Sequence, residues 1–209
     1  MRLIIIRHGE TEWNRLRRTQ GTTDTALSVR GRRQAKRLGA RLSGAGLRCV
    51  YSSPLCRAKE TAAAIALASP AARLELAPAL VEIRFGAWEG LTFEEIAARY
   101  PQELELWNRA PAQCVPPGDS ETLPQVAARL RGFLSGLCER HRGETVAAVS
   151  HSIPCKLMVA LGIGLPLDGI HSLRMDNASM TVLDFYEERA VLRHFNDTAH
   201  LLNLPACHR

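Results

Sequence analysis

The sequence predicts an α/β fold with three layers, in which a mostly parallel central sheet has helices on both faces. The main observation is that short apolar, β-branched runs alternate along the chain with segments of helical periodicity. The first run, Leu3–Ile6, is continuously apolar, which is typical of a strand buried on both sides. Because no internal repeat, low-complexity segment or linker interrupts this alternation, we expect one domain over residues 1–209.

The segment after the first strand is expected to be a loop followed by a helix. Gly9 allows the backbone to turn where the strand ends. Thr11–Thr25 is polar and lacks helical periodicity, so it is predicted to be a loop. Ser28 is a suitable N-cap for the helix that follows, and Gly44 and Gly46 are expected to end that helix.

A second strand and a second helix come next. Cys49–Ser52 has the composition of a strand. Ser53 and Pro54 are expected to cap and start the helix, since proline is tolerated at the first helical position. Arg57 then lies on the first turn, close to the positive end of the helix dipole. Leu74–Leu80 is predicted to be a third strand.

Residues 83–122 differ in character from the rest of the chain, because aromatic side chains gather there among short helical segments. Thr92 begins a capping box, and Tyr100-Pro101 is expected to break the helix that the box starts. We therefore expect a helical, aromatic-rich insertion at about residues 83–122.

The C-terminal half repeats the alternation of strand and helix. Its most informative part is an apolar run that ends in a histidine, as the first strand does. The expected elements are a helix from a Thr122 capping box to about His141, a strand at Val146–His151, a helix that starts at Ser152–Pro154 and reaches Leu161, and a hairpin of Ser179–Phe185 and Ala190–His194 that turns at Glu187-Glu188.

The charge pattern favours a small anionic partner. The chain has 27 basic and 21 acidic residues, a formal net charge of +6. The basic residues are scattered, and no lysine- and arginine-rich block with interleaved aromatics is present, so we expect no nucleic-acid partner. The sequence leaves a monomer and a homodimer both open.

Hydropathy and cysteine usage indicate a cytoplasmic protein without a membrane partner. No apolar stretch approaches the roughly 18 residues that span a membrane, and the N-terminal apolar run is too short for a signal peptide. The six cysteines form no CxxC pair and no metal-type spacing. They are expected to be small hydrophobic fillers in a reducing compartment.

Two buried strands that end in histidine are the main functional signal. His8 and His151 end these strands, and Arg7 and Arg57 accompany them. Such histidines serve as ordinary hydrogen-bonded residues, as zinc ligands or as parts of an anion site. The adjacent arginine disfavours a cation, and neither HxH nor HExxH spacing is present. Guanidinium groups hold phosphate oxygens with charge-assisted hydrogen bonds, so we expect a phosphate site and no metal.

Nearly the whole chain resembles the histidine phosphatase superfamily, the phosphoglycerate mutase-like proteins. The resemblance supports the three-layer fold and implies a phosphohistidine mechanism without a cofactor. The residues that carry it are Arg7–Thr11, Asn14, Gln20-Gly21, Asp24, Leu27-Ser28 with Gly31, Ser52–Ala58, Glu82 and Ser150-His151.

The resemblance also implies a role for each site residue. His8 is the nucleophile that becomes phosphorylated, and Glu82 is the general acid and base. Arg7, Arg57 and His151 bind the transferred phosphoryl group. The further substrate-binding positions that it implies are Asn14, Gln20, Gly21 and Ser152. These roles agree with the chemistry, because a neutral imidazole attacks phosphorus in line while arginines neutralise the equatorial oxygens. Ser152 stands where many relatives have glycine.

Within the superfamily, residues 82–91 resemble the phosphatase branch, as found in α-ribazole phosphatases and broad-specificity phosphatases. Asp176–Ser179 and His151–Pro154 are similar to the metal-independent phosphoserine phosphatases. The expected function is hydrolysis of a small phosphorylated metabolite, with the insertion as a lid over the substrate. A cofactor-dependent phosphoglycerate mutase is the alternative, and a non-catalytic pseudo-phosphatase is a third. The residues leave the substrate open among α-ribazole phosphate, phosphoserine, phosphoglycerate derivatives and sugar phosphates. Candidates for its recognition are Arg84, Phe85, Trp88, Trp107, Asn108 and Arg109, although the aromatics also suit a small core under the lid.

Overall fold

A computed structural model of the chain, which describes residues 1–187, 189–202 and 204, has a six-stranded sheet at its centre. The strand order is β3-β2-β4-β1-β5-β6. Adjacent strands from β3 to β1 are parallel, and β5 and β6 are antiparallel at one edge, so the sheet is mixed. The strands are β1 (Arg2–Arg7), β2 (Leu47–Ser52), β3 (Arg73–Leu76), β4 (Thr145–Ser150), β5 (Met180–Phe185) and β6 (Ala190–Asp197).

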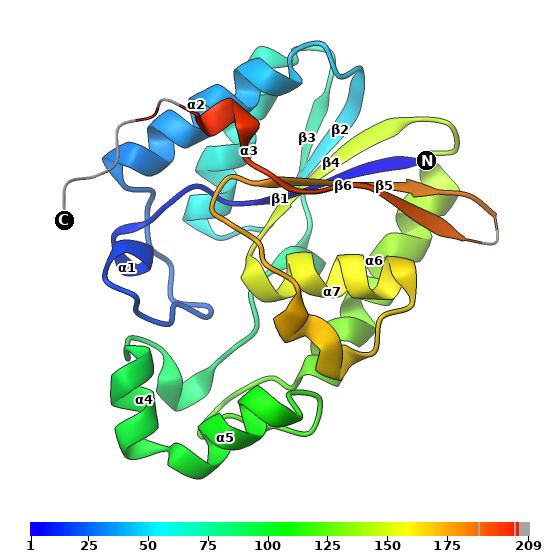
Figure 1. Cartoon of the computed structure of the whole chain (residues 1–209). Coiled ribbons are helices and arrows are strands. Elements are labelled where there is room, and N and C mark those ends of the chain that lie inside the picture. Colours follow the sequence, from blue (N-terminus) through cyan, green and yellow to red (C-terminus); the bar gives the residue numbers. More distant parts are fainter. Residues whose placement is uncertain (188, 203, 205–209) are drawn as a thin grey trace.

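Helices cover both faces of the sheet, which confirms the α/β fold class. Figure 1 shows α2 and α3 on one side of the sheet and α6 and α7 on the other, with α4 and α5 lying beyond the second group. The α-helices are α1 (Glu12–Arg15), α2 (Val29–Leu42), α3 (Cys56–Ala68), α4 (Phe93–Arg99), α5 (Pro101–Arg109), α6 (Leu123–Arg140) and α7 (Ser152–Ile163). The 3₁₀ turns are η1 (Pro78–Leu80), η2 (Gly86–Trp88), η3 (Leu167–Ser172) and η4 (Ala199–Leu201).

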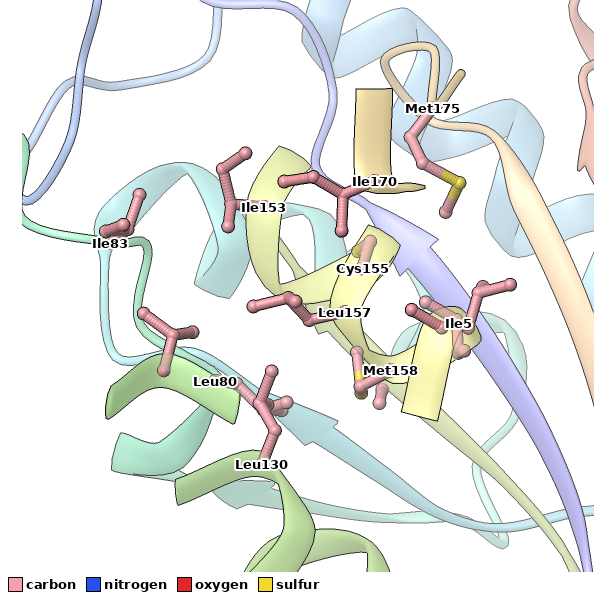
Figure 2. Packing of buried hydrophobic residues seen from close by; sticks show 14 of the residues in the cluster. Ile5, Leu80, Ile83, Leu130, Ile153, Cys155, Leu157, Met158, Ile170 and Met175 are labelled. Carbon is pink, nitrogen blue, oxygen red and sulfur yellow. The ribbon is translucent and has the colours of Figure 1, made fainter. Parts of the chain in front are cut away.

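The continuous apolar run in β1 arises because both faces of this strand are covered. Leu3 and Ile5 belong to a core cluster with α6 and α7, whereas Ile4 and Ile6 belong to a second cluster with α2 and α3. Successive side chains of a strand point to opposite faces, so each layer receives alternate residues. Figure 2 shows Ile5 beside Met158 of α7 in the first cluster. β4 divides its side chains between the two clusters in the same way.

The predicted caps of three helices are confirmed. The Ser28 hydroxyl accepts a 3.0 Å hydrogen bond from the Gly31 N–H and caps α2. Thr92 and Thr122 form capping boxes with residues three positions later, at the start of α4 and α6. The break at Tyr100-Pro101 is also present, since α4 ends at Arg99 and Pro101 opens α5.

Other local predictions were wrong. Thr11–Thr25 is not all loop, because Thr11 caps the helix α1, which at four residues is too short to show a helical period. Ser53 does not cap α3: the helix starts at Cys56 after Leu55, which makes no side-chain capping bond. The helix expected to start at Ser152–Pro154 does begin at Ser152, as α7, but His151 and not Ser152 stands at the N-cap.

The outer strands also differ in extent from the sequence prediction. The third strand ends at Leu76, because Pro78 begins a 3₁₀ turn. The C-terminal hairpin is confirmed and its second strand is longer than expected, reaching Asp197. Glu188, in the predicted turn of this hairpin, lies outside the described residues.

None of the described helices combines the length and the apolar character that a membrane-spanning helix needs. Cys49, Cys114 and Cys155 are buried free thiols, and Cys56 and Cys138 are partly buried free thiols. Burial raises the pKa of the Cys49 thiol to about 11. Cys207 lies outside the described residues. Three of the cysteines therefore act as core fillers, as the sequence predicted.

Candidate active site

The two histidines meet because β1 and β4 are parallel neighbours and end at the same edge of the sheet. The His8 N–H donates a 2.9 Å hydrogen bond to the Ser150 carbonyl, and the rings of His8 and His151 have centroids 5.1 Å apart. A cavity of about 280 Å³ opens at this edge. It is lined by all but one of the predicted site residues, namely Arg7, His8, Asn14, Gln20, Gly21, Arg57, Glu82 and Ser152.

A larger hollow of about 780 Å³ lies between α6 and the β5–β6 hairpin. Its described lining contains no histidine. The candidate site is therefore assigned by its chemistry, at the carboxyl ends of parallel strands, where ligands bind in open α/β sheets.

His8 is held with one ring nitrogen free to react. Its Nδ1 lies 2.7 Å from the Gly9 carbonyl oxygen, which only accepts, so Nδ1 carries the proton and Nε2 has the lone pair. Burial, together with the positive charges of Arg57 and Arg7, holds the pKa of His8 well below its ordinary value. The ring is therefore neutral at physiological pH, the form that a nucleophile requires.

Gly9 is required by close packing rather than by a turn. Its φ is not among the positive values of the described glycines, so no left-handed conformation requires glycine here. A Cβ at this position would lie 2.7 Å from the carbonyl oxygen of Gly31 in α2. The absence of a side chain lets the backbone after β1 lie against the start of this helix.

Arg57 is fixed by three hydrogen bonds at the start of α3. Its Nη1 donates to the Thr23 carbonyl (2.8 Å) and its Nη2 to the Gly21 carbonyl (2.7 Å). Its Nε donates to Nδ1 of His151 (3.1 Å). Each of the two Nη groups keeps one N–H for a ligand. Gly21 has a φ of +53°, so glycine at this position allows the conformation that directs its carbonyl at Arg57.

His151 is fully buried and does not line the cavity. Because Nδ1 accepts from Arg57, the proton resides on Nε2, which donates to the Ser53 hydroxyl at 2.8 Å. Burial and the charge of Arg57 hold the pKa of His151 well below its ordinary value. In this structure His151 supports Arg57, and its expected contact with a phosphoryl group stays a prediction.

Arg7 carries an unsatisfied donor. Its Nη1 donates to the Met175 carbonyl (2.6 Å), but its buried Nε has no hydrogen-bond partner among the described residues. A buried N–H without a partner costs about 1–3 kcal/mol, and more when it is charged. The site therefore favours an anion that supplies the missing acceptor.

Glu82 is a buried carboxyl group beside the two arginines. Its Oε1 accepts hydrogen bonds from the N–H groups of Ile83 (3.1 Å) and of Ile153 (3.3 Å), the latter in the first turn of α7. Burial raises the pKa of Glu82, an effect that Arg57, Arg7 and these hydrogen bonds offset in part. The raised pKa suits a carboxyl that gives and takes a proton.

Asn14 is oriented by Asn177, which the sequence prediction did not assign to the site. Its Oδ1 accepts from the Thr11 N–H (3.1 Å), the Thr11 hydroxyl (3.2 Å) and Nδ2 of Asn177 (3.0 Å). Its Nδ2 is thereby left as a donor for a ligand. Asn177 also donates to the carbonyl of His8 at 3.2 Å, and no motif signalled this contact.

Glu89 joins the 83–122 insertion to the loop that holds Arg57. Its carboxylate accepts from the backbone N–H groups of Thr22 (3.0 Å) and Thr23 (3.1 Å) and from both threonine hydroxyls. It also accepts from the Phe85 N–H at 3.2 Å. The segment that supplies carbonyl groups to Arg57 is thus fixed by a residue more than 60 positions away.

The aromatic residues of the insertion pack together and extend the core cluster that α6 and α7 form with β1. The ring centroids of Phe85, Trp88 and Trp107 lie 5.5 to 6.1 Å apart. Trp88 is buried away from the cavity, whereas Phe85 and Trp107 also line it. The other candidates for substrate recognition, Arg84, Asn108 and Arg109, do not line the cavity.

Metal-ligand sets are absent from the part of the chain that the structure describes: no group of three or more His, Cys, Asp or Glu side chains there is arranged to hold an ion. The described charged groups that line the cavity with His8 are instead Arg7, Arg18, Arg57, Lys156 and the carboxyl of Glu82, an excess of cations that suits a phosphate ester.

Comparison with known proteins agrees with this chemistry. The family model of the histidine phosphatase superfamily (branch 1) matches residues 3–198. Phosphoserine phosphatase 1 of Hydrogenobacter thermophilus is 39% identical over 203 residues, which cover 96% of this chain and 94% of that protein. A probable phosphoglycerate mutase, GpmB, of Salmonella arizonae is 30% identical over 209 residues, which cover 96% and 95% of the two chains.

Solved structures support the same conclusion. A phosphoserine phosphatase mutant from Entamoeba histolytica, in complex with phosphoserine, superposes with a TM-score of 0.87 and 31% sequence identity, covering 96% of this chain and 99% of that one. The chain therefore belongs to the histidine phosphatase superfamily. Within that superfamily it is a phosphatase.

Proposed function

We propose that the protein hydrolyses a small phosphomonoester in two steps through a phosphohistidine on His8, without a metal ion. The observation that carries this proposal is the 2.7 Å contact between Nδ1 of His8 and the Gly9 carbonyl, because it leaves Nε2 as the nucleophile. The cavity of about 280 Å³ lies just below the 300–1,000 Å³ of typical ligand pockets, so we expect a small substrate.

In the first step, Nε2 of His8 attacks phosphorus, and the bond between phosphorus and the ester oxygen breaks. Glu82 gives its proton to the departing oxygen, so the alcohol leaves neutral. Arg7 and Arg57 neutralise the equatorial oxygens, and Nδ2 of Asn14 adds a donor. In the second step Glu82 takes a proton from water, which attacks phosphorus and releases inorganic phosphate and neutral His8.

The supporting residues belong to the same proposal. Gln20 and Gly21 shape the phosphate side of the cavity, and Ser152 lines it at the first residue of α7. We propose that residues 83–122 cover the substrate as a lid, because Phe85 and Trp107 line the cavity from this segment. Glu89 anchors the lid through its bonds to Thr22 and Thr23.

The experiment that tests the mechanism is capture of the phosphoenzyme. Protein mixed briefly with p-nitrophenyl phosphate in chelator and quenched in base is expected to carry one phosphoryl group on the peptide that contains His8. The His8→Ala variant is expected to carry none and to lack turnover. Undiminished hydrolysis by His8→Ala, or full dependence on an added divalent metal, contradicts the proposal.

The similarity to a probable phosphoglycerate mutase favours one competing function. A mutase returns the phosphoryl group to the bound product instead of passing it to water. With 3-phosphoglycerate and a trace of 2,3-bisphosphoglycerate, we expect release of inorganic phosphate to exceed formation of 2-phosphoglycerate. The opposite ratio assigns the chain to mutase chemistry. Absence of any turnover by the wild type favours the pseudo-phosphatase.

A further inference from the structure

Lys156 is a cation of the cavity for which the phosphoryl chemistry provides no role. It lies on α7, lines the cavity and is partly buried, whereas Lys36 and Lys59 are exposed on α2 and α3. Within residues 1–187, 189–202 and 204, its Nζ forms no hydrogen bond and no ion pair. The ammonium group therefore faces the cavity without a partner of its own.

The neighbouring cations either form hydrogen bonds within the protein or lie beside His8, where the phosphoryl group is expected. Arg57 is held by two carbonyls and His151, and Arg7 presents its free Nε beside His8. Arg18, which also lines the cavity, is bonded to the Gly90 carbonyl and to Glu95, the latter at 3.1 Å. Two guanidinium groups suffice for the three equatorial oxygens of a phosphoryl group. Lys156 is thus available for a different part of the ligand.

The position of Lys156 on α7 indicates which part of the ligand it binds. Ile153, in the first turn, donates its N–H to Glu82 at 3.3 Å, and Lys156 follows three residues later on the same face of the helix. Glu82 is the group that protonates the departing oxygen in the proposed mechanism. Lys156 is therefore one helical turn from the leaving-group side, where the alcohol portion of the substrate lies.

The charge of the cavity indicates the chemistry of that portion. Arg18 has its own carboxylate partner, Glu95, so among the described lining residues Arg7, Arg57 and Lys156 are opposed by a single carboxyl, that of Glu82. Burial lowers the pKa of Lys156, and an anion beside Nζ would reverse this effect. An anionic group on the leaving alcohol satisfies the unpaired ammonium, and a carboxylate is the smallest organic anion that the small cavity can take beside a phosphoryl group.

We propose that Lys156 is a specificity-determining residue that binds a carboxylate on the leaving alcohol, so that the substrates are small phosphorylated carboxylic acids. This inference rests on the proposed function, because the leaving alcohol is located from the position of Glu82, the proposed proton donor. It assigns the phosphoserine and phosphoglycerate type of substrate to this chain, and it places ribazole and sugar phosphates without a carboxylate among poor substrates.

Two pairs of substrates test the inference, because the members of each pair differ in the carboxylate. Glycerol 3-phosphate has a hydroxymethyl group where 3-phosphoglycerate has its carboxylate, and phosphoethanolamine is phosphoserine without its carboxylate. In wild type we expect kcat/KM to favour the acid of each pair by about tenfold to a hundredfold, as a charge-assisted hydrogen bond provides. In Lys156→Met this ratio is expected to fall to about 1, mainly through a higher KM for the acid.

Lys36→Met is the matched control, since it removes an exposed lysine of α2, and it is expected to keep the wild-type ratio. Lys156→Arg is expected to keep most of the preference, because it retains the positive charge. Thermal unfolding of each variant shows whether the exchange has altered the fold.

A wild type without preference for the acids, or a Lys156→Met variant that keeps it, overturns the inference. Preference for 2,3-bisphosphoglycerate over 3-phosphoglycerate that is lost in Lys156→Met also overturns it, since the anion is then a second phosphate. Failure of the proposed function is seen separately, as hydrolysis of p-nitrophenyl phosphate that survives His8→Ala.

Discussion

Replacing Glu82 by glutamine separates the two chemical steps. The side-chain oxygen of glutamine accepts the same hydrogen bonds from the N–H groups of Ile83 (3.1 Å) and Ile153 (3.3 Å), so the shape of the site is kept. The amide neither gives nor takes a proton. General acid–base catalysis contributes about 10²- to 10⁴-fold, which corresponds to about 3 to 5 kcal/mol of barrier. We expect Glu82→Gln to lose this factor in kcat/KM for alkyl phosphates.

The aryl substrate p-nitrophenyl phosphate is expected to respond differently. Its leaving phenolate is stable without a proton, so phosphorylation of His8 proceeds, whereas the attack of water on the phosphoenzyme loses its base. Rapid mixing of Glu82→Gln with this substrate should therefore release about one equivalent of p-nitrophenolate per site in a burst, followed by slow turnover. Glu105→Gln, an exposed exchange on α5, serves as the control. Equal losses for aryl and alkyl substrates without a burst would refute the assignment of both proton transfers to Glu82.

Three further predictions follow from the geometry around His8. Gly9→Ala places a Cβ 2.7 Å from a backbone oxygen of α2, so we expect about 1–3 kcal/mol of destabilisation, measured as a lower denaturation midpoint. Because the pKa of His8 is held well below 6.5, kcat/KM corrected for substrate ionisation should fall on the acid side only well below that pH. It should also fall as the pH rises through the raised pKa of Glu82, and Glu82→Gln should lack this alkaline limb. Glu89→Ala removes the acceptor that holds the threonines beside Arg57, so KM should rise about tenfold, with partial rescue in Glu89→Gln.

The parts of the fold that follow from local physics were predictable. Burial of β1 on both faces requires a continuous apolar run, and the run at residues 3–6 has this composition. The capping boxes at Thr92 and Thr122 involve residues only three positions apart, so the sequence contains the whole interaction. The meeting of His8 and His151 followed from the rule that parallel strands present their carboxyl ends at one edge.

One wrong prediction and one contact that was not predicted concern groups whose partners are distant in the chain. Ser53 has the composition of a helix cap, but its hydroxyl accepts a hydrogen bond from His151, almost a hundred residues later. The contact of Asn177 with Asn14 likewise spans 163 residues. No local pattern encodes such bonds, because they exist only once the sheet order is fixed.

The distance along the chain between contacting groups also explains why the class of reaction was easier to predict than the substrate. His8 and His151 follow strand ends, whose direction the chain specifies locally, whereas the proposed leaving-group side is formed by α7 and the insertion, which only tertiary packing brings together. α7 joins the two functions, because its first turn holds Glu82 through Ile153 and its next turn carries Lys156. A shift of this helix must move the proposed proton donor, Glu82, and the proposed carboxylate partner, Lys156, together. Changes of specificity at Lys156 are therefore expected to preserve catalysis only when they leave the backbone of α7 in place.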